Sequence, residues 1–308
     1  MVFRLHPLLL LALLLAICAG LILGVAALRS RHAATTGDLL TYLPRTEGVT
    51  VVIDMEALRR NGVLAALAGA RVAEEPEYQV FVTETGFNYE QDLDLVVAEF
   101  GKETSFFLLR GRFDWPRLRA YVQSQGGACH NSFCQVGGST PQRQISFLPL
   151  KTNLMAMAVG PSRESAWQLA RPHPDARPRT PPARPVWLAI SSGFLKNVQS
   201  LHPGARLLAS ALEGVGEVEF SLEIAPGRLE VLMDAVCRTP GDAAVLSSQI
   251  EQVTRLLKGT NASGGAAGYP GDLLAVLSAG SIRAQGPHVL GQWPIERGFL
   301  EGILGSSQ

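Results

Sequence analysis

Aromatic residues and charge are both scarce in this sequence. Only 7% of the 308 residues are aromatic and 18% are charged, and Lys+Arg and Asp+Glu are equal at 27 each, so the formal net charge is zero. A nucleic-acid-binding protein normally carries a basic excess on one face, so a nucleic-acid partner is not expected. The hydrophobic fraction of 47% is too high for a disordered chain. The length predicts roughly two folded domains of ordinary size.

The sequence also lacks the common catalytic motifs. It contains no HExxH, GxSxG, Walker or GxGxxG pattern. None of its six histidines has a carboxylate or cysteine at a spacing typical of catalytic or metal sites. These absences favour a non-enzymatic protein that needs no cofactor.

An uncharged apolar run extends from Pro7 to Leu28. A helix rises about 1.5 Å per residue, so this run could cross a bilayer core of about 30 Å. We expect residues 1–32 to be a single-pass membrane anchor with a short cytoplasmic N-terminus, and the lipid bilayer to be a partner through residues 7–28. A cleaved signal peptide ending at Ala27 and a lipoprotein attached through Cys18 are the alternatives. The remainder of the chain is then expected to be periplasmic or extracellular.

A stretch rich in proline and arginine, residues 171–185, divides the remainder of the chain. Such a stretch cannot form a helix or a central strand and prefers an extended, semi-rigid conformation. We therefore expect a first α+β unit at residues 33–170, a linker at 171–185, and a second α+β unit at 186–308.

The two units have a similar expected order of elements. In the strand pair Asp92–Phe100 and Thr104–Phe113, alternation places Leu93, Leu95 and Val97 on one face, as in a half-buried sheet. The other predicted strands are Val49–Met55, Ser132–Val136, Gln144–Leu150 and Asn153–Gly160 in the first unit, and Pro185–Ser191, Gly216–Ala225, Gly227–Cys237 and His288–Ile295 in the second. Helices are expected to begin at Asp114 and Thr239, which are good N-cap residues. The predicted fold class is α+β: an N-terminal transmembrane helix followed by two similar strand-helix-strand-strand-helix units with mostly antiparallel sheets. A duplication and a chance likeness of two α+β units both explain this order.

Two cysteines lie five residues apart in a glycine-flanked segment, at Cys129 and Cys134. They could close a hairpin as a disulfide in an oxidising compartment, or stay as two thiols in a turn. A metal site would recruit His130, but no second pair of ligands completes it.

The densest polar cluster comprises Glu84, Glu90, Asp92 and Asp94. Asp92 and Asp94 are predicted to share one face of a strand, and paired carboxylates can bind Ca²⁺ or transfer protons. The spacing lacks the order of a calcium-binding loop, so a solvated strand entry is the preferred interpretation.

Three segments together resemble a group of uncharacterised bacterial envelope proteins. They are LPRTEGVTVVIDMEALR (Leu43–Arg59), TGFNYEQDLD (Thr85–Asp94) and GRFD (Gly111–Asp114). The resemblance covers the first half of the soluble part. It implies a single N-terminal span and a mixed α+β exterior domain, and none of its motifs is catalytic.

The sequence therefore favours a membrane-anchored, non-enzymatic binding or structural module of the cell envelope, whose partner is an envelope protein or a lipid. The alternative is an envelope hydrolase or metal-dependent enzyme with a site near Asp92, Asp94 and His130.

Overall fold

The structure is a computed structural model. It describes residues 34–64, 76–138, 140, 142–174, 179–196, 209, 211–212, 214–225, 228–262 and 273–296.

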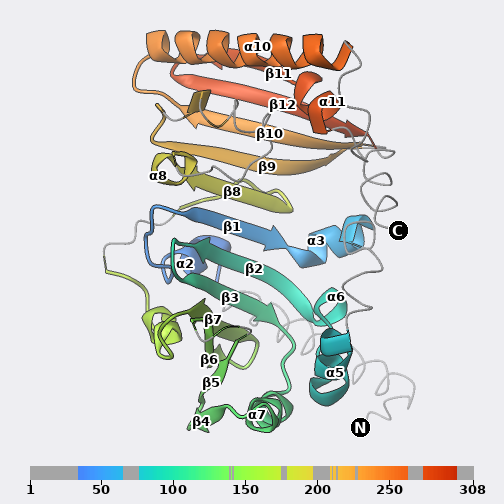
Figure 1. Cartoon of the computed structure of the whole chain (residues 1–308), viewed down its shortest axis with the longest axis vertical. Coiled ribbons are helices and arrows are strands. Elements are labelled where there is room, and N and C mark those ends of the chain that lie inside the picture. The colour runs from blue at the N-terminus through green and yellow to red at the C-terminus, as the bar shows by residue number, and fades with distance from the viewer. Residues whose placement is uncertain are drawn as a thin grey trace, which may run out of the picture.

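The described strands form one 12-stranded antiparallel sheet, in the order β11-β12-β10-β9-β8-β1-β2-β3-β7-β6-β5-β4 (Figure 1). The predicted fold class is therefore wrong, because the strands of the two expected units do not form separate sheets. They join where β1 (Val49–Asp54) pairs with β8 (Val186–Ser191), with Val52 opposite Trp187. Alternation within a strand shows which face is buried, but it does not show which distant strand will be its neighbour.

The other strands lie on the two sides of this central pair. The first half contains β2 (Leu93–Phe100), β3 (Ser105–Gly111), β4 (Ala128–His130), β5 (Phe133–Gly137), β6 (Gln144–Lys151) and β7 (Leu154–Gly160). The second half contains β9 (Glu217–Ala225), β10 (Arg228–Val236), β11 (Ser281–Gln285) and β12 (His288–Glu296). Outward from the centre, the first half has β1, the β2–β3 hairpin, β7 and β6, and the second half has β8, the β9–β10 hairpin, β12 and β11. In both halves, therefore, the hairpin is followed by the later strand of a second hairpin and then by its earlier strand. The first half adds β5 and β4 beyond this common order.

Helices connect and cover these strands. They are α2 (Thr36–Leu40), α3 (Met55–Arg60), α5 (Pro76–Thr85), α6 (Tyr89–Asp92), α7 (Trp115–Ser124), the 3₁₀ helix η1 (Ser165–Leu169), α8 (Ser192–Leu195), α10 (Pro240–Ala262) and α11 (Leu273–Ser278). The helix predicted to begin at Asp114 is confirmed, since the Asp114 carboxylate accepts a hydrogen bond from the Arg117 amide at 3.1 Å. The predicted helix start at Thr239 is also confirmed. The Thr239 hydroxyl accepts a hydrogen bond from the Asp242 amide at 3.1 Å, and the Asp242 carboxylate accepts one from the Thr239 amide at 3.2 Å.

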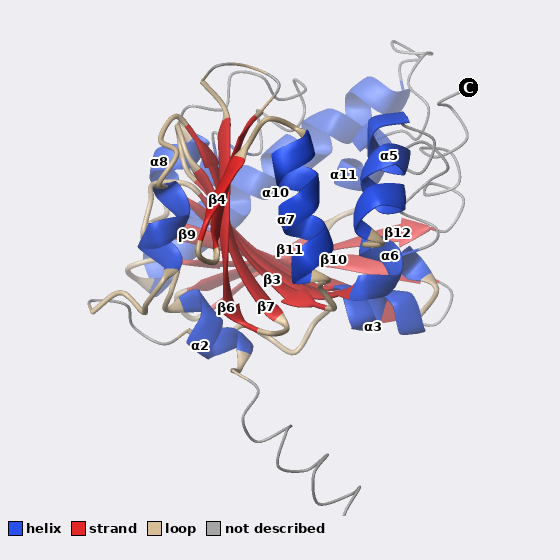
Figure 2. Cartoon of the chain, turned by 90° about the horizontal axis from the view of Figure 1, so that it is seen from below, coloured by secondary structure: helices blue, strands red, loops and turns tan. Residues whose placement is uncertain are grey.

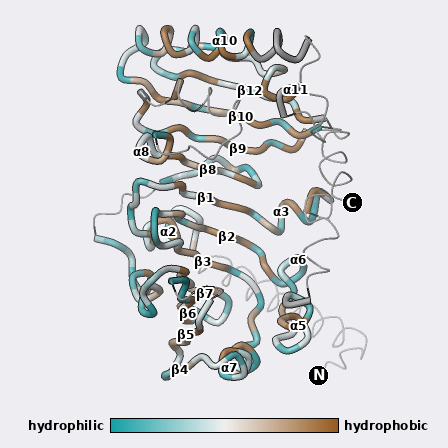
Figure 3. Tube along the Cα trace, in the orientation of Figure 1, coloured by the Kyte–Doolittle hydropathy of each residue, from teal (hydrophilic) through white to brown (hydrophobic). Residues whose placement is uncertain are grey.

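The two faces of the sheet are covered differently (Figure 2). On one face, named here the α10 face, α3, α7 and α10 pack on the strands with residues such as Leu58, Val122 and Ile250. On the other, named here the α2 face, α2 and η1 cover the first half of the sheet. Leu39 and Leu169 pack there with the fully buried Leu108. Figure 3 shows the apolar residues following the strands and the inner side of α10.

The expectation of a transmembrane helix requires correction. Within the described ranges, no helix is both long enough and apolar enough to span a membrane. The run from Pro7 to Leu28, on which the expected anchor, signal-anchor and bilayer contact depend, lies outside the described residues.

The described part of the proline-rich stretch is fixed to the sheet. The Pro185 carbonyl accepts a hydrogen bond from the Asp54 amide at 2.7 Å, and the His173 amide donates to the Thr41 carbonyl at 2.8 Å. Arg179 forms an ion pair with Glu217 on β9, with an N–O distance of 2.8 Å. The linker therefore contacts both halves of the sheet.

Candidate binding groove

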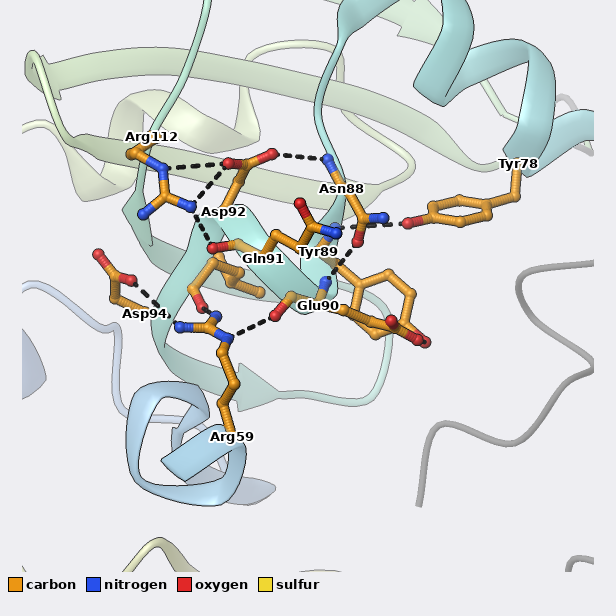
Figure 4. A network of polar contacts seen from close by, with 10 residues as sticks. Arg59, Tyr78, Asn88, Tyr89, Glu90, Gln91, Asp92, Asp94 and Arg112 are labelled. Carbon is orange, nitrogen blue, oxygen red and sulfur yellow. Dashed lines mark hydrogen bonds and ion pairs between the residues drawn. The ribbon is translucent and has the colours of Figure 1, made fainter. Parts of the chain in front are cut away.

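Three members of the acidic cluster singled out in the sequence, Glu90, Asp92 and Asp94, lie in or directly after α6 (Figure 4). Asp92, the last residue of α6, accepts a hydrogen bond from the Asn88 amide at 2.9 Å. Its other oxygen lies 3.1 and 2.9 Å from two guanidinium nitrogens of Arg112, which also donates to the Gln91 carbonyl. Asp92 therefore closes the α6 turn and ties it to the residue that follows β3.

Arg59 of α3 approaches the same segment from its other side (Figure 4). It donates to the carbonyl oxygens of Glu90 and Leu93, both at 2.6 Å, and lies 3.9 Å from the Asp94 carboxylate. Asp92 and Asp94 do not share a strand face as expected, because β2 begins only at Leu93.

The other members of the acidic cluster do not complete a site. Glu84, on α5, accepts a hydrogen bond from the Ser124 hydroxyl at 3.3 Å, away from the α6 network. His130 is exposed on β4, and four strands separate β4 from β2. Among the described residues, no group of three or more His, Cys, Asp or Glu side chains is placed to hold a metal ion. Nothing in these described residues indicates enzymatic activity.

Two tyrosines pack beside this network. The Tyr78 hydroxyl accepts a hydrogen bond from the Tyr89 amide at 3.4 Å, and the two ring centroids are 5.6 Å apart. Burial raises the pKa of the Tyr78 phenol, and the charges of Glu90 and Asp92 raise it further. Burial likewise raises the pKa of Tyr89. These phenols therefore serve as neutral packing and hydrogen-bonding groups at physiological pH.

Cys129 and Cys134 lie directly opposite each other on β4 and β5. Their Cα atoms are 4.1 Å apart and their sulfur atoms are bonded at 2.05 Å. Cys134 is fully buried against Leu118 and Val122 of α7, so the bridge joins the edge hairpin to the core on the α10 face.

A groove lies on the α2 face of the second half, where no described helix covers the sheet. Its volume is about 520 Å³, within the range of about 300–1,000 Å³ typical of small-molecule sites. One wall is the linker segment Thr180–Arg184. The floor consists of side chains from β8 to β12, and the β11 edge lies at the far end.

Strand register arranges the floor in two neighbouring rows that cross the sheet. The first row is uncharged and runs through Ser281, Gln292, Leu232, Ser221 and Trp187. The second row runs through Arg283, Leu290, Asp234 and Glu219 and carries the charge. The groove therefore offers apolar surface and opposite charges within one hollow.

The polar groups of the groove have defined partners. The indole nitrogen of Trp187, a residue only 2% exposed, donates to the Glu219 carboxylate at 3.1 Å. Asp234 lies 2.9 Å from Nδ1 of His288. Arg184 is directed to the Ser221 hydroxyl at 3.2 Å and the Glu223 carboxylate at 3.4 Å.

A second, smaller hollow of about 120 Å³ lies near the central strand pair. The 4% exposed Glu99 faces it and accepts hydrogen bonds from the hydroxyls of Thr46 and Thr50, the latter at 2.6 Å. The carboxylate is thus already bound by the protein's own hydroxyl groups.

Comparisons with known proteins give only distant similarity. No protein-family model and no curated protein matches the chain. Crystal form I of TP0453 matches with a TM-score of 0.49 and 12% identity, covering 87% of this chain and 97% of that one. Crystal form III of TP0453 matches with a TM-score of 0.48 and 12% identity, covering 86% and 97%. The resemblance to bacterial envelope proteins stays a prediction.

The groove was missed in the sequence, although one signal for it is present. In the sequence, Pro226–Gly227 is a common turn pair between two predicted strands. A turn there pairs Ala225 with Arg228, and this register places Glu219 opposite Asp234. Counting the opposed residue pairs outward from this turn would have predicted that the two carboxylates face each other across the hairpin. The linker wall and the β11 end of the groove leave no comparable local signal.

Proposed function

We propose that this chain is a non-enzymatic binding module that works outside the cytoplasm, and that the groove on the α2 face is its ligand site. The observation that carries this proposal is the 520 Å³ hollow in a sheet face whose counterpart in the first half is filled by α2 and η1. A sheet face that no described helix covers and that holds both Leu232 and charged side chains suits a ligand with apolar and polar parts.

The proposed location is supported by the disulfide between Cys129 and Cys134. Disulfides form and persist in oxidising compartments and are rare in the cytosol. An envelope protein or a lipid is the partner class inferred from the sequence, and the mixed groove lining is compatible with either. The enzyme alternative near Asp92, Asp94 and His130 is the less favoured one, because Arg112 and Arg59 already bind the two carboxylates.

The test is a ligand screen against two matched tryptophan variants of β11. Ser281 lines the groove, whereas Gln285 is on the same strand and the same face but outside it. Both residues are exposed, so neither substitution disturbs the core. We expect Ser281→Trp to abolish binding of the compounds, peptides or lipids that bind the native chain, and Gln285→Trp to preserve it. Equal binding by both variants would overturn the assignment of the groove.

A further inference from the structure

Two pairs of acidic residues face each other across the β9–β10 hairpin on the α2 face. Glu223 is opposite Glu230, and Glu219 is opposite Asp234. Side chains directly opposite on antiparallel strands have Cβ atoms about 4.5–5.5 Å apart, and like charges there are destabilising. Each pair therefore needs a compensating cation or costs stability.

Among the described residues, arginine side chains bind only the first of these pairs. Arg228 and Gln292 bind Glu230 at 2.5 and 2.6 Å, and Arg184 binds Glu223 at 3.4 Å. Both arginines lie outside ion-pair distance of the second pair.

Within the described part of the chain, no Lys or Arg forms an ion pair with Glu219 or Asp234. Their partners are the neutral indole N–H of Trp187 and the imidazole of His288. This second pair, which no described Lys or Arg binds, is also the one that lines the groove.

The surface next to this pair is apolar. Leu290 is directly opposite Asp234, and Leu232 is the groove-lining residue two positions before Asp234 on β10. Both leucines are half-buried, so a ligand can cover surface that they now expose. An alkyl chain fits beside them, and an ammonium group at its end would reach the two carboxylates.

Resting on the proposed function of the groove, we propose that its ligand carries an alkylammonium group, which is held between Asp234 and Glu219 with its carbon chain on Leu232 and Leu290. The same chemistry occurs in free alkyl amines and in lysine side chains. Charge-assisted hydrogen bonds to two carboxylates contribute more than neutral ones, and the groove wall reduces competition from water.

The test uses nuclear magnetic resonance titration of the native chain with three probes: 1,5-diaminopentane, Nα-acetyl-lysine methylamide and glutarate. The indole N–H signal of Trp187, assigned through Trp187→Phe, reports on the groove because it is bonded to Glu219. We expect the two amines to shift this signal and glutarate to leave it unchanged. Tighter binding of the lysine derivative than of the diamine would indicate a peptide source, and the reverse a free amine.

Isosteric variants test which carboxylates bind the ammonium group of the ligand. Asp234→Asn and Glu219→Gln should each weaken amine binding at least tenfold, whereas Glu223→Gln, which alters the compensated pair, should change it less than twofold. Leu290→Lys supplies an internal ammonium beside Asp234 and should abolish amine binding without removing a buried group.

The outcomes separate the two proposals. Binding of glutarate at the groove, blocked by Ser281→Trp, would overturn the alkylammonium ligand and leave the binding role in place. Absence of any shift with the amines, or amine binding unaffected by Asp234→Asn and Leu290→Lys, would also overturn it. The screen with the β11 tryptophan variants decides the binding role independently.

Discussion

On the α2 face, β2 and β3 present Val97 opposite Leu108, whereas the corresponding positions of β9 and β10 present Ser221 opposite Leu232. Both first-half residues are fully buried under α2 and η1. In the second half the same face borders the groove. Strand order is shared by the two halves, so the covering helices account for the difference. Where these helices pack, the sheet face is core, and where no described helix packs, the same face borders a groove.

The largest expected effect tests this difference directly. Leu108→Ala removes a fully buried side chain, and such substitutions cost about 2–5 kcal/mol of unfolding free energy. Leu232→Ala should cost less than about 1 kcal/mol, since this half-buried side chain already contacts the groove. Urea unfolding measures both values. Equal losses would show that the second-half face is as closely packed as the first.

The disulfide is the next largest contribution and belongs to the β4–β5 hairpin, which has no counterpart among the described strands of the second half. A bridge closing so short a loop contributes about 2 kcal/mol by restricting the unfolded chain. The double variant Cys129→Ser, Cys134→Ser should lose about that amount in urea unfolding and keep its fold by circular dichroism. A loss of folding altogether would mean that the β4–β5 hairpin supports the whole first half.

A smaller effect concerns the cap of α2, the helix that covers the first half. The Asp38 carboxylate accepts hydrogen bonds from the Thr35 hydroxyl and amide, both at 2.8 Å. These bonds lower the pKa of Asp38. A lowered folded-state pKa contributes stability above the unfolded-state value of about 3.9, and this stability is lost as the pH falls through the folded-state pKa.

Thr35→Ala should therefore destabilise the chain by about 1 kcal/mol at pH 7, the usual cost of losing an N-cap. The difference between variant and native chain should shrink below about pH 4, because protonated Asp38 no longer needs these donors. Thermal unfolding across this pH range measures it. A difference that stays constant with pH would assign the effect to the hydrogen bond that the Thr35 hydroxyl accepts from the Asp38 amide, which does not depend on the Asp38 charge.

The smallest effect is kinetic and concerns Cys237, the free thiol at the end of β10. Burial raises the pKa of Cys237, and the neighbouring Asp242 charge raises it further. Because the thiolate is the reactive form, alkylation near pH 8 should be several-fold slower in the folded chain than in denaturant. A Cys18→Ser background removes the remaining cysteine outside the disulfide. Asp242→Asn should speed the reaction slightly, and equal rates in folded and unfolded chains would contradict the burial of this thiol.

The sequence predicted strands better than their assembly. The strands predicted at Gly216–Ala225 and Gly227–Cys237, on either side of a strong turn pair, are confirmed as β9 and β10. The sequence of β11, SIRAQ, carries only two apolar residues, and this strand was missed. The β1–β8 pairing joins residues far apart in the sequence, and local patterns do not contain such information. The groove depends on that long-range assembly and was missed with it.

The order of the sheet also decides where another polypeptide could extend it. A sheet has unsatisfied backbone hydrogen-bonding groups only along its outermost strands, and exposed outermost strands can recruit further chains and start aggregation. Here one of them, β4, has three residues and is crosslinked to its neighbour. The other, β11, has five residues and lies beside α10 (Figure 1). The long apolar strands all lie between these two short ones, so the architecture itself limits polymerisation of so extensive a sheet.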